Sequence, residues 1–424
     1  MHKKQYITRS IEEVLRNAAE TFKVVIMGGS RQVGKSTLMQ HVLSERGDVK
    51  IISFDNPDLR AAAKADPELF LSQYSSPLMI DEFQYVPELL PFIKMKVDLR
   101  DDAGLYFLTG SQLFKMMSAA GESLAGRAAV LTLSSFSQAE IENNVAAAPF
   151  LPSERMQCDS PATLKDVQRA VFTGGMPALV CGNGKVNRDI FFSSYVQTYI
   201  ERDIRQVLQL RDIGKFRSFL ACIAARTGEE LVFEDVASTV GVDAKTIKSW
   251  IGVLEATGLV FLLHAWHGNP VKRVVKRPKL HFMDTGLACY LANMSAPEML
   301  FGTQQAGHFF ESWVVGQIVR SYQAAGLDPA NYLYCYRDDG GREIDLLIAR
   351  NGRLYPVEIK LSANPGLAAM KHFSVVGELG LPCGTGCVLS LTANTVPVRD
   401  RGTIVNVASL WRQDRKGNSP NNSI

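Results

Sequence analysis

The fold is decided by KVVIMGGSRQVGKSTLMQHVLSER, residues 23–46 of a 424-residue chain. The apolar run at 23–27 predicts a buried strand, and the pattern at 35–46 predicts a helix. The octapeptide between them, GSRQVGKS at 29–36, fits the pattern G-x-x-x-x-G-K-[ST]. Glycines let a backbone wrap closely around phosphates, and the N-terminus of the next helix favours negative charge. A strand, a glycine loop and a helix in this order predict a site for nucleotide phosphates.

The loop also predicts which side chains meet the nucleotide. Lys35 is expected to reach the β- and γ-phosphates of ATP, and Ser36 is expected to ligate Mg²⁺. The residues expected to surround the nucleotide are Gly29, Ser30, Arg31, Gln32, Val33, Gly34, Lys35, Ser36 and Thr37.

Strand and helix patterns continue to alternate over the first 140 residues, with further apolar strands expected at 49–54, 78–81, 105–109 and 128–133. Short apolar strands separated by helices predict a parallel sheet that is covered on both faces. The strand LMID (78–81) carries Asp81 to its C-terminal end, where ligands collect in such sheets. Asp81 is therefore expected to hold Mg²⁺ through water, and Glu82 to orient or deprotonate the attacking water.

Other polar positions of this part are candidates for the same reaction. Thr109 or Ser111 would lie beside the γ-phosphate as a sensor, although strand ends often carry such residues for turn reasons alone. Arg127 in ESLAGRA is a candidate for an arginine supplied to the site of a neighbouring subunit in a homo-oligomer. An ordinary surface salt bridge explains Arg127 equally well.

The middle of the chain predicts helices. Residues 151–226 are expected to form a helical lid or linker, within which YVQTYIERDIRQVLQL (195–210) has apolar residues near helical spacing. In residues 227–295, a helix at 234–240, a Gly241-Val242 turn, a helix at 243–255 and a strand at 259–264 follow the order of a winged helix-turn-helix.

Basic residues gather around the second of these two helices. Lys245 and Lys248 are expected to face outward, and a basic run follows at Lys272, Arg273, Lys276, Arg277 and Lys279. Such a patch suits the phosphates of DNA. A solvated loop on a protein-docking or lid element explains it as well, and the sequence leaves both open.

Composition narrows the class of protein. The formal net charge is only +3, so no overall field calls for nucleic acid or an anionic membrane. No apolar run approaches the length of a membrane span, and no N-terminal signal is visible. The seven cysteines are expected to be reduced thiols, with a zinc site at Cys383 and Cys387 left open. These features predict a soluble, multidomain, cytoplasmic protein without a membrane partner.

The C-terminal part, residues 296–412, is expected to hold a helix around 311–322 and strands at 332–336, 343–349 and 354–361, before a disordered tail at 413–424. Asn351-Gly352 is a strong signal for a two-residue hairpin loop. Facing residues then have numbers that add up to 703, as those of the loop pair do, which sets Asp345 opposite Glu358.

Two facing carboxylates repel each other, and a hard divalent cation would relieve the repulsion. The alternative is a solvated or salt-bridged face in which Glu343 simply pairs with Lys360. Pro356 would interrupt the second strand, which suggests an edge position or a bulge.

Several motifs together resemble a known family, the AAA+-like P-loop ATPases fused to a C-terminal PD-(D/E)XK nuclease-like domain. They are GGSRQVGKSTL (28–38), IDEFQ (80–84), LTGSQ (108–112), SLAGR (123–127), FTGGMP (172–177), YIERDI (199–204) and MDTGLA (283–288). The resemblance implies an α/β P-loop ATPase with a parallel sheet in residues 1–150. A helical and winged-helix region and an α/β restriction-endonuclease-like domain would follow.

The spacing E-x-D, then E-x-K, is similar to that of the PD-(D/E)XK nucleases. That resemblance implies Asp345 and Glu358 as ligands of a second Mg²⁺ or Mn²⁺, with Glu311 as an extra acid and Lys360 as the catalytic lysine. The expected function is then a Mg²⁺-dependent ATPase coupled to a DNA-facing winged helix and a nuclease-like domain. The alternatives are a nucleotide-gated switch, or an ATP-gated regulator, whose C-terminal domain binds protein or DNA without cutting it.

Overall fold

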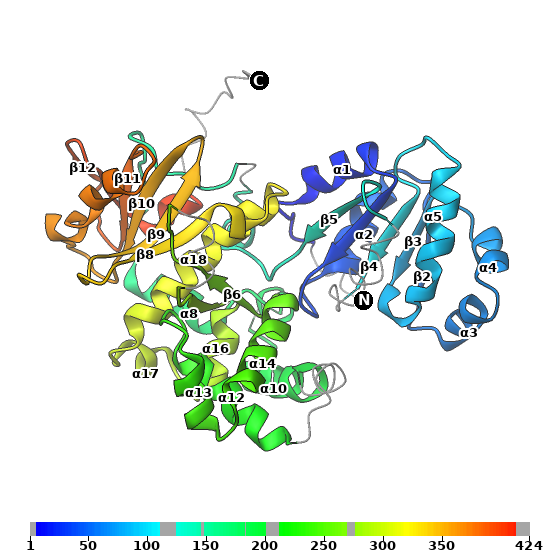
Figure 1. Ribbon diagram of the computed structural model, residues 1–424, viewed down its shortest axis with the longest axis horizontal. Coiled ribbons are helices and arrows are strands. Elements are labelled where there is room, and N and C mark those ends of the chain that lie inside the picture. The colour runs from blue at the N-terminus through cyan, green and yellow to red at the C-terminus, as the bar shows by residue number, and fades with distance from the viewer. Residues whose placement is uncertain are drawn as a thin grey trace.

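The structure is a computed structural model and describes residues 6–110, 124–145, 148–182, 184–200, 212–268 and 276–412. Figure 1 shows the N-terminal sheet toward one end of the longest axis and the C-terminal sheet toward the other, with the helices of the middle of the chain between and below them. Ser111, Lys272, Arg273 and the tail at 413–424 lie outside the described residues.

The N-terminal sheet is fully parallel, as the alternating pattern predicted. Its strand order is β2-β3-β4-β1-β5. The strands are β1 (Val24–Gly28), β2 (Lys50–Ser53), β3 (Leu78–Asp81), β4 (Tyr106–Thr109) and β5 (Ala128–Thr132). The helices are α1 (Glu12–Thr21), α2 (Lys35–Ser44), α3 (Pro57–Ala65), α4 (Pro67–Gln73), α5 (Leu90–Asp98) and, after β5, α7 (Gln138–Ile141).

Helices cover both faces of this sheet. Val25 and Met27 of β1 point to one face, where they share a core with α1 and α2. Val24 and Ile26 point to the other face and pack with residues of α3, α4 and α5. Because successive side chains of a strand point to opposite faces, a strand that is apolar throughout must be covered on both.

The described residues of the middle of the chain are mainly helical from 164 to 256, and residues 201–210 of the expected helix at 195–210 lie outside the described residues. Its elements are α8 (Leu164–Thr173), α9 (Pro177–Val180), α10 (Arg188–Tyr195), the π-helical turn η3 (Val196–Ile200), α12 (Ile213–Ala225), α13 (Phe233–Val240) and α14 (Ala244–Ala256). The antiparallel pair β6 (Val260–Leu263) and β7 (Lys279–Phe282) follows, and then α16 (Thr285–Leu291) and α17 (Pro297–Phe301).

Local sequence signals explain the α13–α14 unit. Gly241 ends α13 in the left-handed conformation, and the Asp243 side chain accepts a hydrogen bond from Thr246 N at 2.8 Å to begin α14. Ile247 and Trp250 are buried, whereas Lys245 and Lys248 are exposed, as the helical spacing predicted.

The C-terminal part is a mixed sheet packed on one long helix, α18 (Ala306–Ala324). The sheet has the order β12-β13-β11-β10-β9-β8. The strands are β8 (Leu333–Arg337), β9 (Glu343–Arg350), β10 (Arg353–Ile359), β11 (Gly386–Ser390), β12 (Val396–Val398) and β13 (Gly402–Asn406). Most side chains of α18 are buried, and one continuous apolar core joins this helix, the sheet and the helices of the middle of the chain.

The hairpin of β9 and β10 has the predicted register. Tyr355 faces Ile348 and Val357 faces Leu346, and both Asn351 and Gly352 have positive φ, as a two-residue primed turn requires. The edge position expected for Pro356 is wrong, because β10 lies inside the sheet and its register with β9 passes Pro356 without a shift. On the β11 side the pairing slips by one residue around Pro356, from Leu354 opposite Cys383 to Val357 opposite Cys387, which is an irregularity of the expected bulge kind. The missing N–H of Pro356 faces this side, where regular pairing begins only at Val357, so no ladder bond is lost.

Candidate functional site

The phosphate loop follows the central strand of the N-terminal sheet. Gly29 has φ 125°, and a Cβ placed on it would lie 2.0 Å from Leu133 O, so only glycine fits beside the end of β5. Gly34 has φ 95° and immediately precedes α2. The loop therefore has the strand, glycine and helix context that the motif requires.

Lys35 is buried at the base of this loop. Its Nζ donates hydrogen bonds to Gly29 O at 3.0 Å and to Ser30 O at 2.8 Å. Burial lowers the pKa of Lys35 to about 8, against the opposing effect of the carboxylates of Glu82 and Asp81. An ammonium group held in this way gains from any anion that enters the loop.

Side chains from three neighbouring elements meet at one carboxylate oxygen. Ser36 Oγ, at the start of α2, donates to Asp81 Oδ1 at 2.8 Å, and the hydroxyl of Thr109 at the end of β4 donates to the same oxygen. Glu82 follows Asp81 with φ 52°, and Gln84 Nε2 donates to its carboxylate. The structure thus brings together four residues that the sequence assigned to one site.

Arg127 lies at the opposite edge of the same sheet. Its backbone oxygen accepts from Val24 N at the beginning of β1, whereas the phosphate loop follows the end of β1. Its guanidinium group forms an ion pair with Asp98 and donates to Ala125 O at 3.0 Å. Arg127 therefore does not reach the phosphate loop of its own chain, and a role in the site of a neighbouring subunit stays a prediction.

Residues that the motif did not reveal also touch the loop. Arg9 Nη1 donates to Val33 O at 2.8 Å, and its Nε pairs with Glu140 at 3.0 Å. Tyr195 of α10 donates its hydroxyl to Arg31 O at 3.4 Å. Helical spacing predicted only that Tyr195 is a core residue. The sequence signal that could have predicted its hydrogen bond is that a buried tyrosine hydroxyl needs a partner.

The helix-turn-helix part reaches the loop as well. A Cβ placed on Gly258, between α14 and β6, would lie 3.8 Å from Ser30 N. The ring of Tyr199 lies 5.4 Å from the guanidinium carbon of Arg31. The phosphate loop thus lies beside two elements that follow it by more than 150 residues.

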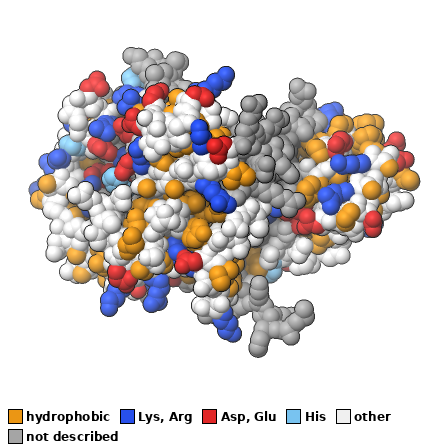
Figure 2. All heavy atoms as spheres, turned by 90° about the horizontal axis from the view of Figure 1, so that it is seen from below, with side chains coloured by type: hydrophobic (Ala, Val, Ile, Leu, Met, Phe, Trp, Pro, Cys, Tyr) orange, Lys and Arg blue, Asp and Glu red, His pale blue; other side chains and the backbone are white. Residues whose placement is uncertain are grey.

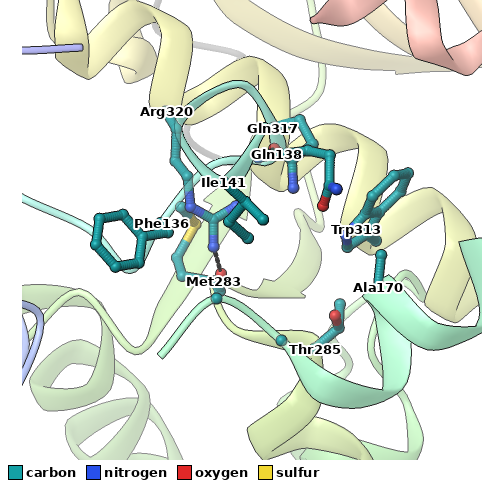
Figure 3. Close-up of a pocket in the computed structure, with 11 residues that line it drawn as sticks. Phe136, Gln138, Ile141, Ala170, Met283, Thr285, Trp313, Gln317 and Arg320 are labelled. Atoms are coloured by element: carbon teal, nitrogen blue, oxygen red, sulfur yellow. Dashed lines mark hydrogen bonds between the residues drawn. The ribbon is translucent and has the colours of Figure 1, made fainter. Parts of the chain in front are cut away.

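Two further motifs form a joint between the three parts of the chain. Asp284 accepts hydrogen bonds from Gly175 N at 2.9 Å and Leu287 N at 3.0 Å, and a Cβ on Gly175 would lie 2.2 Å from Phe136 O. A small cavity lies beside this joint, and Figure 3 shows Arg320 of α18 reaching Met283 O next to Phe136. The glycines of FTGGMP and MDTGLA lie where the chain segments of this joint pack too closely for a larger side chain.

The carboxylates of the C-terminal hairpin lie together, but each faces a lysine. Lys360 Nζ lies 3.2 Å from Asp345 Oδ2 and 2.6 Å from Glu358 Oε1. Burial, together with the charge of Asp345, raises the pKa of Glu358 to about 7 and that of Glu311 to about 8. Glu343 pairs with Lys279 rather than with Lys360.

The sequence placed Lys279 in an exposed basic patch, and this expectation is wrong. The side chain of Lys279 is 8% exposed, and its Nζ lies 2.9 Å from Glu311 Oε1. Lys276 donates to Arg337 O at 3.0 Å, and Arg277 is exposed. On the face drawn in Figure 2, acidic and basic side chains are interspersed, in keeping with a net charge of +3.

Within the described ranges, no three His, Cys, Asp or Glu side chains are placed so that they could hold a metal ion. The ammonium group of Lys279 fills the space between Glu311, Glu343 and Asp345, so these residues do not fit a second Mg²⁺ or Mn²⁺ as they stand. Cys383 is exposed and Cys387 is buried, and among the described residues they do not belong to a group of ligands that could hold zinc.

Family models match three consecutive parts of the chain. Residues 21–142 match an AAA domain. This part of the chain is a P-loop ATPase domain. Residues 164–298 match a domain of unknown function, DUF8612, and residues 306–410 match another, DUF4143. The helical middle and the C-terminal sheet thus correspond to two families whose descriptions name no activity.

Similar proteins were also found along most of the chain. The uncharacterized proteins Mb2031c of Mycobacterium bovis and Rv2008c of Mycobacterium tuberculosis are each 27% identical over 85% of this chain and 76% of their own length. Among solved structures, the Walker-type ATPase PABY2304 of Pyrococcus abyssi is 15% identical over 68% of this chain and 97% of its own, with a TM-score of 0.41. The RuvB Holliday junction branch migration motor of Thermotoga maritima is 19% identical over 59% of this chain and 88% of its own, with a TM-score of 0.30.

None of the helices in the described residues has the length and apolar character that crossing a bilayer requires.

Proposed function

We propose that the chain hydrolyses ATP at the loop of residues 29–37 in a Mg²⁺-dependent reaction. The observation that carries the proposal is the convergence of Lys35, Ser36, Asp81 and Thr109 at the C-terminal ends of β1, β3 and β4. Open parallel sheets bind ligands at this edge.

Each residue has a role that its position supports. Lys35 binds the β- and γ-phosphates, because its buried ammonium group now has only backbone oxygens within hydrogen-bonding distance among the described residues. Glu82 orients and deprotonates the attacking water, and Thr109 positions Asp81. Mg²⁺, held by Ser36 and Asp81, would neutralise phosphate charge when bound.

The test compares Lys35→Ala and Glu82→Gln with the unchanged protein, measuring nucleotide binding and phosphate release. Lys35→Ala should abolish nucleotide binding. Glu82→Gln should keep binding and lower the rate by a factor of about 10² to 10⁴, the usual contribution of a general base. Lys50→Ala, on the exposed edge strand β2, is the matched control. An ATPase rate that Lys35→Ala leaves unchanged would rule out this site.

We further propose that nucleotide state is transmitted to the helix-turn-helix part. The observations that favour such a switch are the hydrogen bond of Tyr195 to Arg31 O and the position of Gly258, on which a Cβ would lie 3.8 Å from Ser30 N. A phosphate bound by the loop changes the backbone to which both elements are fitted. ATP should therefore alter hydrogen exchange at 254–260 in the unchanged protein and not in Lys35→Ala.

Under this proposal the C-terminal domain binds a protein or DNA partner without cutting nucleic acid, because two lysines already pair with its carboxylates. Labelled single- and double-stranded DNA and RNA should stay intact with Mg²⁺ or Mn²⁺, with or without ATP. Cleavage that disappears in both Asp345→Ala and Glu358→Ala would instead establish the nuclease that the resemblance implies.

A further inference from the structure

The C-terminal carboxylate cluster receives a cation from another part of the chain. Lys279, the first residue of β7, lies with its Nζ 2.7 Å from Glu343 Oε1, 2.9 Å from Glu311 Oε1 and 3.8 Å from Asp345 Oδ1. The acids come from α18 and β9, whereas the lysine belongs to the strand pair that follows the helix-turn-helix. One ammonium group thus lies among three carboxylates.

The second lysine completes the neutralisation from the other side. Lys360 contacts Asp345 Oδ2 and Glu358 Oε1, so the two oxygens of Asp345 face two different lysines. Buried carboxylates are costly unless they are paired in this way. Burial and the charge of Asp345 raise the pKa of Glu311 to about 8 and that of Glu358 to about 7.

The backbone of Lys279 is fixed on both sides. It pairs with Leu263 of β6 and forms a bridge with Glu230, and Leu280 N donates to Glu229 O at 3.0 Å. The side chain of Lys279 is only 8% exposed, so its ammonium group is enclosed among the carboxylates while β7 stays in this position.

We propose that Lys279 is the resident cation of this cluster, and that it both pins the β6–β7 pair to the C-terminal domain and excludes divalent metal ions. A divalent ion and an ammonium group cannot share the space between the same oxygens, since like charges at this distance repel strongly. The inference does not depend on ATP hydrolysis at the phosphate loop.

The test is a Mn²⁺ titration of the full chain, with free Mn²⁺ followed by electron paramagnetic resonance. Asp81→Asn is included in every sample so that the phosphate-loop acids do not contribute. Adding Asp345→Asn to the Asp81→Asn protein should leave Mn²⁺ binding unchanged. If the Asp81→Asn protein, with Lys279 intact, bound one Mn²⁺ per chain and Asp345→Asn abolished that binding, the proposal would be overturned.

The second arm removes the cation. Lys279→Met should create a Mn²⁺ site at least tenfold tighter than anything in the background protein, and Asp345→Asn should abolish it. Lys276→Met, three residues earlier and away from the carboxylates, is the matched control and should gain nothing. A folded Lys279→Met protein without the new site would also overturn the proposal. Lys279→Met with Glu311→Gln gives a second variant with one buried acid fewer, should the single change prevent folding.

Discussion

At the scale of single residues, Lys35 links the phosphate loop to pH. Burial lowers its pKa to about 8 in the free protein, and bound phosphates favour the protonated form. ATP binding near pH 8 should therefore take up protons, and affinity should fall by up to about tenfold per pH unit as the pH rises above that value. Calorimetry at pH 8 in two buffers of different ionisation enthalpy measures the uptake, and at pH 6.5 the uptake through Lys35 should vanish. Equal heats in the two buffers at pH 8 would contradict the assignment.

His281 should control stability in acid. It is fully buried on β7, its Nδ1 lies 3.0 Å from Ser312 Oγ, and burial lowers its pKa from 6.5 to about 3. Since the unfolded chain binds the proton more readily than the folded chain between these values, this residue costs stability as the pH falls from 6.5 toward 3. His281→Asn should flatten the pH dependence of the melting temperature in that range. The exposed His41→Asn is the control, and parallel curves for His281→Asn and the unchanged protein would refute the prediction.

At the scale of elements, Asp284 fixes the beginning of α16 to the end of α8. Asp284→Ala removes the helix cap, worth about 1 kcal/mol, and leaves the N–H of Gly175 without its acceptor, which costs about 1–3 kcal/mol. We expect a loss of roughly 2–4 kcal/mol in the free energy of unfolding, measured by urea denaturation. Asp284→Asn should recover part of it. Asp212→Ala, which removes only the exposed cap of α12, should cost less, and equal losses would mean that the Gly175 contact adds nothing.

At the scale of the whole molecule, Arg320 of α18 joins the ATPase domain to the rest of the chain. Its Nε donates to Ser135 O at 3.0 Å and its Nη2 to Ser135 Oγ at 3.0 Å, while Met283 O accepts from the same group. Arg320→Met leaves buried acceptors unpaired at about 1–3 kcal/mol each. We expect calorimetry to show the ATPase domain unfolding separately from the remainder.

The control for this prediction is Arg16→Met, which removes ion pairs with Glu12 and Glu45 inside the N-terminal part and should leave the pattern of transitions unchanged. An unaltered transition in Arg320→Met would show that the apolar contacts alone hold the parts together.

The sequence by itself determined what depends on near neighbours. The loop at 29–36, the parallel sheet and the turn at Asn351-Gly352 follow from glycine conformations and apolar periodicity over a few residues, and the β9–β10 register follows from the turn. The same reasoning placed Lys35, Ser36, Asp81 and Thr109 together, because the ends of parallel strands share one edge.

Only the tertiary structure decided which distant groups meet. Lys279 lies in a basic run of sequence, yet its strand directs it into the carboxylates of α18 and β9. Tyr195 and Gly258 reach a loop that precedes them by more than 150 residues. Local propensity carries no information on such contacts, since they arise from how the helices and sheets pack, and buried charges and hydroxyls then find their partners across that packing.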